Sequence, residues 1–260
     1  MSIQFFAPRS STGQQVHLPR EYRRSVRWQP QIGDIFPDFT VRTTRGDIRF
    51  WDYAEGHWTH LFSHPVAFSP VCTTEIAAFA GLRDTFARHD IRHLTLTGSS
   101  VEDQFDWHCE MEETFGVTID WPCAEDPSLE LSRCFGMLHQ KEAGDHMIRK
   151  SFVVGPDLKI RLISEYPMFV GRNSEEVLRV IRAIQMHEST GFATPSDWEE
   201  GDCLIVPDTE VEARARRVPE LRILEILPYL RVACCAQSGS VRMPVGHGVR
   251  CADNLSDTGG

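Results

Sequence analysis

Short β-type segments alternate with amphipathic helical patterns in the centre of this chain, and this alternation restricts the fold more than any other feature. Residues 59–63 and 91–98 predict two strands. Between them, four apolar residues recur at spacings of three, three and four: Ile76, Phe79, Leu82 and Phe86. Such a stripe predicts a helix with one buried face. A strand, a helix and a second strand in this order are typical of an α/β layer architecture.

A hairpin and a second helix are predicted farther along the chain. Residues 151–154 and 158–163 flank a Gly-Pro-Asp turn at 155–157, which favours an antiparallel pair. Asn173 and Glu176 then have the spacing of a helix capping box. The buried face of that helix would comprise Val177, Ile181 and Ile184.

Shorter elements after Gly191 indicate a small second domain, with strands at 203–206 and 229–232 around a charged helix at 210–217. The first thirty residues have five arginines, one acidic residue and no apolar periodicity, so we expect a flexible basic arm. We therefore expect four segments: an arm at 1–30, a large domain at 31–190, a small domain at 191–235 and a disordered tail at 236–260.

Composition excludes several classes of protein. The 260 residues are 41% hydrophobic and 25% charged, which is ordinary for a globular chain. The formal net charge of −10 disfavours a nucleic-acid binder. No apolar run approaches the ~20 residues of a membrane span, and no secretory signal is visible. We expect a cytoplasmic protein; an organelle presequence is the alternative for the arm, although Pro8, Pro19 and Pro30 interrupt any helix there.

The eight cysteines show no paired C-x-x-C spacing of the zinc type, so we expect no metal site. Cys72 differs from the others because it lies where a predicted strand ends and a helix begins. Free N–H groups and the positive end of the helix dipole favour a thiolate there. Ser69 can place a hydroxyl beside the sulfur, and Pro65 can shield it. The alternative is a helix start capped by Ser69 or Thr73, with Cys72 as filler.

The residues around this cysteine resemble the active-site motif P-x-x-x-[TS]-x-x-C of peroxiredoxins, present as Pro65, Ser69 and Cys72. Further matches resemble the one-cysteine group typified by peroxiredoxin six: Leu-Phe-Ser-His-Pro at 61–65, Pro-Val-Cys-Thr-Thr-Glu at 70–75, Gly-Arg-Asn at 171–173, Thr-Pro-Ser-Asp-Trp at 194–198 and Tyr-Leu-Arg at 229–231. The resemblance implies a thioredoxin-like α/β domain followed by a small α+β dimerisation domain.

It also implies a thiol peroxidase without a cofactor, in which Cys72 attacks a hydroperoxide and becomes a sulfenic acid. Arg149 matches the family's active-site arginine, and Glu75 and Arg172 match residues that orient it. His64 matches a histidine near the site. From the residues alone, Arg149 could be a surface strand residue, Glu75 a first-turn carboxylate, Arg172 a residue before a helix cap and His64 a core residue.

Two departures from the group affect function. Some members have a phospholipase site, but His57 and Trp51 replace its serine and histidine here and only Asp157 is kept, so we expect no lipase activity. Cys234 and Cys235 lie where relatives often have no thiol. They are either two small terminal residues or resolving thiols that form a disulfide with oxidised Cys72, with Cys234 preferred.

The resemblance implies three kinds of partner: a hydroperoxide substrate, an external thiol such as glutathione or thioredoxin, and a second copy in a homodimer or larger homo-oligomer. One alternative function is a thioredoxin-fold redox sensor or chaperone-like protein without turnover. Another is a thiol-disulfide oxidoreductase, which is weak because Ser69 and Glu75, each three residues from Cys72, are not cysteines.

Overall fold

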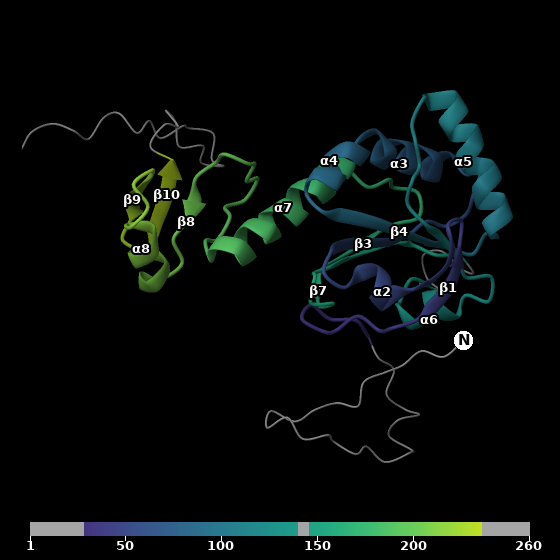
Figure 1. The fold of residues 1–260 in the computed structure, drawn as a ribbon, viewed down its shortest axis with the longest axis horizontal. Helices are drawn as coiled ribbons and strands as arrows, with labels where there is room; N and C mark the ends of the chain where they lie inside the picture. Colours follow the sequence, from purple (N-terminus) through teal and green to yellow (C-terminus); the bar gives the residue numbers. More distant parts are fainter. Residues whose placement is uncertain (1–28, 140–145, 236–260) are drawn as a thin grey trace, which may run out of the picture. The chain divides into compact units, whose positions relative to one another are not determined.

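The computed structural model describes residues 29–139 and 146–235, so residues 1–28 of the predicted arm and the whole predicted tail lie outside this range (Figure 1). The chain divides after Ser174 into two compact units. The sequence pattern placed the helix after residue 173 in the first domain, whereas helix α7 (Ser174–Thr190) belongs from Glu175 onward to the C-terminal unit. The division has a physical basis, because Arg179 and Arg182 of α7 bind the Trp198 carbonyl and the Glu200 carboxylate.

The first unit contains a seven-stranded mixed sheet with the strand order β2-β1-β5-β4-β3-β6-β7. Its strands are β1 (Thr40–Thr43), β2 (Gly46–Arg49), β3 (Trp58–Ser63), β4 (Ile91–Thr97), β5 (Cys123–Glu125), β6 (Arg149–Val154) and β7 (Ile160–Tyr166). Strands β3, β4 and β5 run parallel, and the remaining pairings are antiparallel. The predicted strands β3 and β4 and the predicted hairpin β6–β7 are therefore confirmed, and the structure shows that β3 and β4 pair in parallel.

Helices cover both faces of this sheet. Figure 1 shows α3 (Pro70–Gly81), α4 (Arg83–Arg88) and α5 (Val101–Phe115) on one side, and α2 (Phe50–Ala54) and α6 (Glu130–Cys134) on the other. The predicted helix between β3 and β4 is divided at Leu82, which leaves the helical region at φ −99° and ψ 6°. The structure also contains α5, which we did not predict although Ser100 caps its start and Gly116 ends it at φ 64°.

Central strand β3 shows how the two faces differ. Leu61 packs in an apolar core with residues of α2 and α6, including Phe50 and Leu131. On the opposite face, the rings of His60 and Phe62 pack against Phe79 of α3. Because helices cover both faces, all six residues of β3 are buried, and the hydrogen bonds of polar side chains in this strand can form only inside the protein.

The hairpin after β6 begins its second strand two residues later than predicted. Leu158 has a positive φ of 65°, and its N–H donates to the Gly155 carbonyl. These features place Leu158 in the turn and not in the strand, so β7 begins at Ile160.

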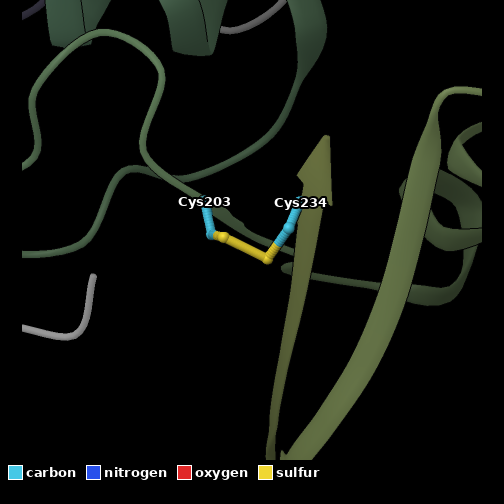
Figure 2. Close-up of a disulfide and its surroundings, with 2 residues drawn as sticks. All are labelled: Cys203 and Cys234. Carbon is cyan, nitrogen blue, oxygen red and sulfur yellow. A yellow bond between two sulfur atoms is a disulfide. The ribbon is translucent and has the colours of Figure 1, made fainter. Parts of the chain in front are cut away.

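The C-terminal unit contains a three-stranded antiparallel sheet with the order β8-β10-β9. After α7 it comprises β8 (Leu204–Ile205), α8 (Thr209–Ala215), β9 (Leu221–Leu227) and β10 (Leu230–Cys235). Strand β9 was not predicted, whereas α8 lies within one or two residues of the charged helix we expected. A disulfide joins Cys203, just before β8, to Cys234 in β10 (Figure 2). Within the described part of the chain, no helix is both long and apolar enough to cross a membrane.

We predict that acid destabilises the protein through its buried histidines. Burial lowers the pKa of His64 and of His93 to about 3. The unfolded chain binds a proton at each histidine below a pH of ~6.5, while the folded chain does not, so the free energy of unfolding decreases as the pH falls from ~6.5 toward ~3. Each of the two should contribute a loss of about 2 kcal/mol between pH ~7 and ~5.

Urea unfolding followed by tryptophan fluorescence at the two pH values tests this expectation. The variant His93→Phe, which keeps a ring in the aromatic cluster, should weaken the pH dependence. Equal stability of the wild type at both pH values would contradict the prediction.

Candidate active site

Cys72 lies in the first turn of α3, shortly after the central strand β3 ends at Ser63. Ser69 is the N-cap residue with extended backbone, and Pro70 occupies the first helical position. Proline suits that position because its φ is helical and it has no N–H to leave unpaired. The thiol of Cys72 is fully buried at the helix end where the unpaired N–H groups and the positive dipole favour an anion.

The guanidinium of Arg149 contacts this thiol. Arg149 is the first residue of β6, which lies beside β3, and its Nη1 donates to Cys72 Sγ at 3.3 Å. Its Nε donates to the Met168 carbonyl at 2.8 Å, which holds the plane of the group. The side chain is only 2% exposed, so Arg149 is not a surface strand residue. A buried guanidinium stays protonated and offers fixed donors to a sulfur anion.

Glu75 lies one turn after Cys72 in α3 and is also buried. Its Oε2 accepts a hydrogen bond from Arg149 Nη1 at 2.6 Å. Burial raises the pKa of this carboxyl, but the charge and hydrogen bonds of Arg172, with the charge of Arg149, outweigh burial and hold the pKa below its ordinary value. Glu75 is therefore ionised, and it orients the arginine that touches the thiol.

Arg172 holds Glu75 from the other side. Its backbone N–H and Nε donate to Glu75 Oε1 at 2.6 and 2.9 Å, and its Nη2 donates to Oε2 at 3.0 Å. Nη2 also donates to the Ser63 carbonyl at 2.7 Å, and the guanidinium lies 4.8 Å from the centre of the Phe62 ring. Arg172 thus ties the helix α3 to the end of β3 through a bidentate pair.

The buried cluster beside the thiol has a net positive charge. Arg149 and Arg172 contribute two positive charges, and Glu75 contributes one negative charge. The excess positive charge faces the thiol, because Arg149 Nη1 donates to Cys72 Sγ. A fixed guanidinium in such a position can stabilise negative charge beside it.

The remaining motif residues shape the approach to the helix. The Ser69 hydroxyl donates to the Val66 carbonyl at 3.1 Å, so in this structure it stabilises the turn before α3 and does not bind the sulfur. Pro65 is buried in the same turn. Phe68 has a positive φ of 56°, which shows how sharply the chain bends before Ser69. No residue pattern in the sequence marks this conformation of Phe68.

His64 is a buried residue beside the site. Its Nε2 lies 3.0 Å from Gln104 Oε1, and its ring packs near Trp107. Burial, with a smaller effect of His108, lowers the pKa of His64 to about 3. His64 is therefore a neutral imidazole at neutral pH, and Nδ1 carries a lone pair if Nε2 donates to Gln104.

The other described cysteines have different surroundings. Burial raises the pKa of Cys123 to about 12, and its thiol donates to Gln104 Oε1 at 3.1 Å. Burial, followed by the charges of Asp126 and Glu130, raises the pKa of Cys134. A raised pKa keeps a thiol protonated and slows its reaction with peroxides.

Cys234 does not have the state that we expected for a resolving thiol. It is bonded to Cys203, with the two Cα atoms 4.5 Å apart (Figure 2). Strand β8 pairs with β10 so that Leu204 lies opposite Ala233, and this register brings the two cysteines together. Their separation of 31 residues gave no sign of the pairing in the sequence. While the bond is intact, Cys234 cannot react with Cys72; Cys235, next to it, is exposed.

The positions related to the phospholipase site are engaged elsewhere. His57 Nδ1 lies 2.7 Å from Asp90 Oδ1, and Trp51 Nε1 donates to the Phe36 carbonyl at 2.8 Å. Asp157 pairs with Arg161 across the hairpin turn. Among the described residues, no cluster of histidine, cysteine, aspartate or glutamate could hold a metal ion.

A thioredoxin-like sheet with a buried helix-start thiol against a guanidinium defines a thiol peroxidase. Comparison with known proteins agrees. The profile of the AhpC/TSA family matches residues 32–163, and that of the C-terminal domain of 1-Cys peroxiredoxin matches residues 183–217. The chain belongs to the AhpC/TSA family as a one-cysteine peroxiredoxin, an enzyme that reduces hydroperoxides with electrons from thiols.

Individual relatives show the extent of the similarity. The chain is 37% identical to Peroxiredoxin-6 of Homo sapiens over 195 residues, which cover 72% of this chain and 87% of that protein. The structure of the yeast mitochondrial 1-Cys peroxiredoxin is 36% identical, with a TM-score of 0.70, and the match covers 78% of this chain and 98% of that one. Peroxiredoxin 6 of Arenicola marina is 32% identical, with a TM-score of 0.72 and coverage of 80% and 99%.

We predict that Arg149→Met lowers the rate constant for peroxide reduction by on the order of a hundredfold, because one charged donor at a developing anion is worth ~3 kcal/mol. Stopped-flow measurement of peroxide consumption by the reduced protein gives the rate constant. Arg83→Met, at a half-buried position of α4 away from the thiol, is the control and should leave it unchanged. An Arg149→Met rate within threefold of wild type would remove Arg149 from the mechanism.

We predict that the Cys203–Cys234 bond stabilises the C-terminal unit by about 3–4 kcal/mol, as expected for a closed loop of this length. The double variant Cys203→Ser, Cys234→Ser should unfold at lower denaturant concentration than the oxidised wild type. Adding a reductant should lower the midpoint of the wild type and leave that of the double variant unchanged. Equal midpoints for the oxidised wild type and the double variant would contradict the prediction.

Proposed function

We propose that Cys72 is the residue that hydroperoxides oxidise and that Arg149 stabilises the charge which develops during this reaction. The observation that supports the proposal is the 3.3 Å contact between Arg149 Nη1 and Cys72 Sγ inside a buried cluster of Arg149, Arg172 and Glu75. Glu75 and Arg172 act on the reaction by orienting Arg149. The proposed substrates are hydrogen peroxide and organic hydroperoxides.

The chemistry requires only these groups and a thiol. The Cys72 thiolate attacks the distal oxygen of the hydroperoxide, a sulfur–oxygen bond forms, and the oxygen–oxygen bond breaks. The leaving alkoxide or hydroxide takes a proton and departs as alcohol or water, and Cys72 is left as a sulfenic acid after protonation. The N–H groups of Arg149 donate hydrogen bonds to the peroxide oxygens on which negative charge accumulates, and this lowers the activation barrier of the reaction.

An external thiol returns Cys72 to its reduced state in this proposal. The thiol attacks the sulfenic acid, water leaves, and a mixed disulfide forms. A second thiol then attacks the mixed disulfide, forms a disulfide with the first thiol and releases Cys72 in its reduced state. In the yeast mitochondrial relative, thiol resolution proceeds via glutathione and thioredoxin systems, so either reductant suits this chain. The bond from Cys234 to Cys203 supports the external route, with Cys235 as the remaining internal candidate.

The proposal extends to assembly and location. We assign a homodimer or a larger homo-oligomer because the C-terminal unit matches the C-terminal domain of 1-Cys peroxiredoxin. We also propose a cytoplasmic location, since the composition of the chain is that of an ordinary globular protein. Analytical ultracentrifugation and cell fractionation test these two assignments.

We predict that Cys72→Ser abolishes peroxide consumption, because no other described cysteine has a helix start and a guanidinium beside it. The assay mixes reduced protein with hydrogen peroxide, first at equal amounts and then with excess thiol. Cys235→Ser is the matched control and should retain turnover with an external thiol. Turnover that survives in Cys72→Ser would refute the assignment, and a Cys235→Ser enzyme that stalls after one reaction would make Cys235 the resolving residue.

A further inference from the structure

A pair of buried histidines lies in the middle of the sheet, outside the groups that the mechanism uses. His60 of β3 and His93 of β4 are neighbours in register, and their Nδ1 atoms are 3.2 Å apart. Both side chains are buried among aromatic rings, including those of Phe79 and Phe86. Polar rings in such surroundings are costly unless they form hydrogen bonds, so the partners of this pair need an explanation.

Ser151 links the histidine pair to the active site. It lies on β6, opposite Phe62 of β3, and is 1% exposed. His60 Nε2 lies 3.1 Å from Ser151 Oγ, and Arg172 Nη1 donates to the same oxygen at 3.0 Å. The hydrogen bonds therefore run without a break from His93 through His60 and Ser151 to Arg172.

The available donor hydrogens and acceptor atoms determine the direction of the hydrogen bonds from Arg172 to His93. Arg172 can only donate, so Ser151 Oγ accepts there, and its own hydrogen needs a second acceptor. The acceptor within reach is His60 Nε2, which places the His60 proton on Nδ1, where it is donated to His93. Every donor thus points away from the guanidinium, and this arrangement makes the Ser151 oxygen a stronger acceptor for it.

We propose that Ser151 and His60 are positioning residues for peroxide reduction, acting through Arg172. The inference rests on the proposed role of Arg149 at Cys72. The Ser151 hydroxyl engages Nη1 of Arg172, and the other contact of that nitrogen, to the Lys150 carbonyl, is longer at 3.4 Å. Losing the hydroxyl lets the Arg172 guanidinium turn and loosens its bidentate grip on the Glu75 carboxylate.

The effect reaches the sulfur because Arg149 Nη1 serves two acceptors, Glu75 Oε2 at 2.6 Å and Cys72 Sγ at 3.3 Å. A Glu75 carboxylate less well neutralised by Arg172 attracts Arg149 more strongly, and the sulfur anion loses its donor. The rate of peroxide reduction then falls, and the pH at which the rate rises moves upward. The charged and titratable groups near this row of hydrogen bonds include Glu75, Arg149, Arg172, His64 and His93.

Ser151→Thr and Ser151→Val provide the test, because threonine and valine have the same shape and differ in the hydroxyl alone. The rate constant for oxidation of each reduced variant by hydrogen peroxide is measured across a pH series. We expect Ser151→Thr to stay within about threefold of wild type, and Ser151→Val to be about tenfold slower with its pH profile displaced upward. His60→Gln, which keeps an acceptor for Ser151, should likewise react faster than His60→Leu.

Thr59→Val is the matched control, because its buried hydroxyl on β3 has no hydrogen-bond partner among the described residues and its loss should change neither rate nor pH profile. The proposed function is tested separately, by whether the wild type consumes peroxide and the variant Cys72→Ser does not. The inference is overturned if Ser151→Val and Ser151→Thr share one rate and one pH profile. It is also overturned if they differ only in melting temperature, which is the result of a purely structural role.

Discussion

The carboxylate of Glu75, held between two buried guanidinium groups, is the interaction on which the rest of the site depends. Arg172 reaches it from the segment after β7, and Arg149 reaches it from the start of β6. Each arginine would be costly in this dry environment without the carboxylate, and the carboxylate would be protonated without them. Their mutual neutralisation leaves one positive charge over, and that charge faces the Cys72 thiol.

The sheet supplies the geometry for this balance. Strands β3 and β6 are neighbours, so the helix that follows β3 and the first residue of β6 meet at one end of the sheet. Polar groups of these buried strands also hold the arginines in place, because the Ser63 carbonyl and the Ser151 hydroxyl both accept hydrogen bonds from Arg172. The polar core is therefore continuous with the active site, while the opposite face of the sheet packs with apolar side chains around Leu61.

Three of the described cysteines have different surroundings, and these surroundings determine what each sulfur can do. Cys72 lies against a cation, Cys123 is buried beside a neutral amide, and Cys234 is joined to Cys203. Of these thiols, only that of Cys72 has a guanidinium as a hydrogen-bond donor, whereas burial raises the pKa of Cys123 to about 12. The disulfide gives the small C-terminal sheet a covalent link between its loop and its central strand, a contribution that matters in a unit with a small core.

The sequence by itself determined the strands β3 and β4, the hairpin and the position of Cys72 at a helix start, because local periodicity and turn residues encode them. The motif resemblance added Arg149, Glu75 and Arg172. Only the tertiary structure decided that the Ser69 hydroxyl binds Val66, that Cys234 pairs with Cys203, and that two histidines meet in the core. The physical reason is that these contacts depend on strand register and on the packing of residues far apart in the chain, which no local pattern specifies.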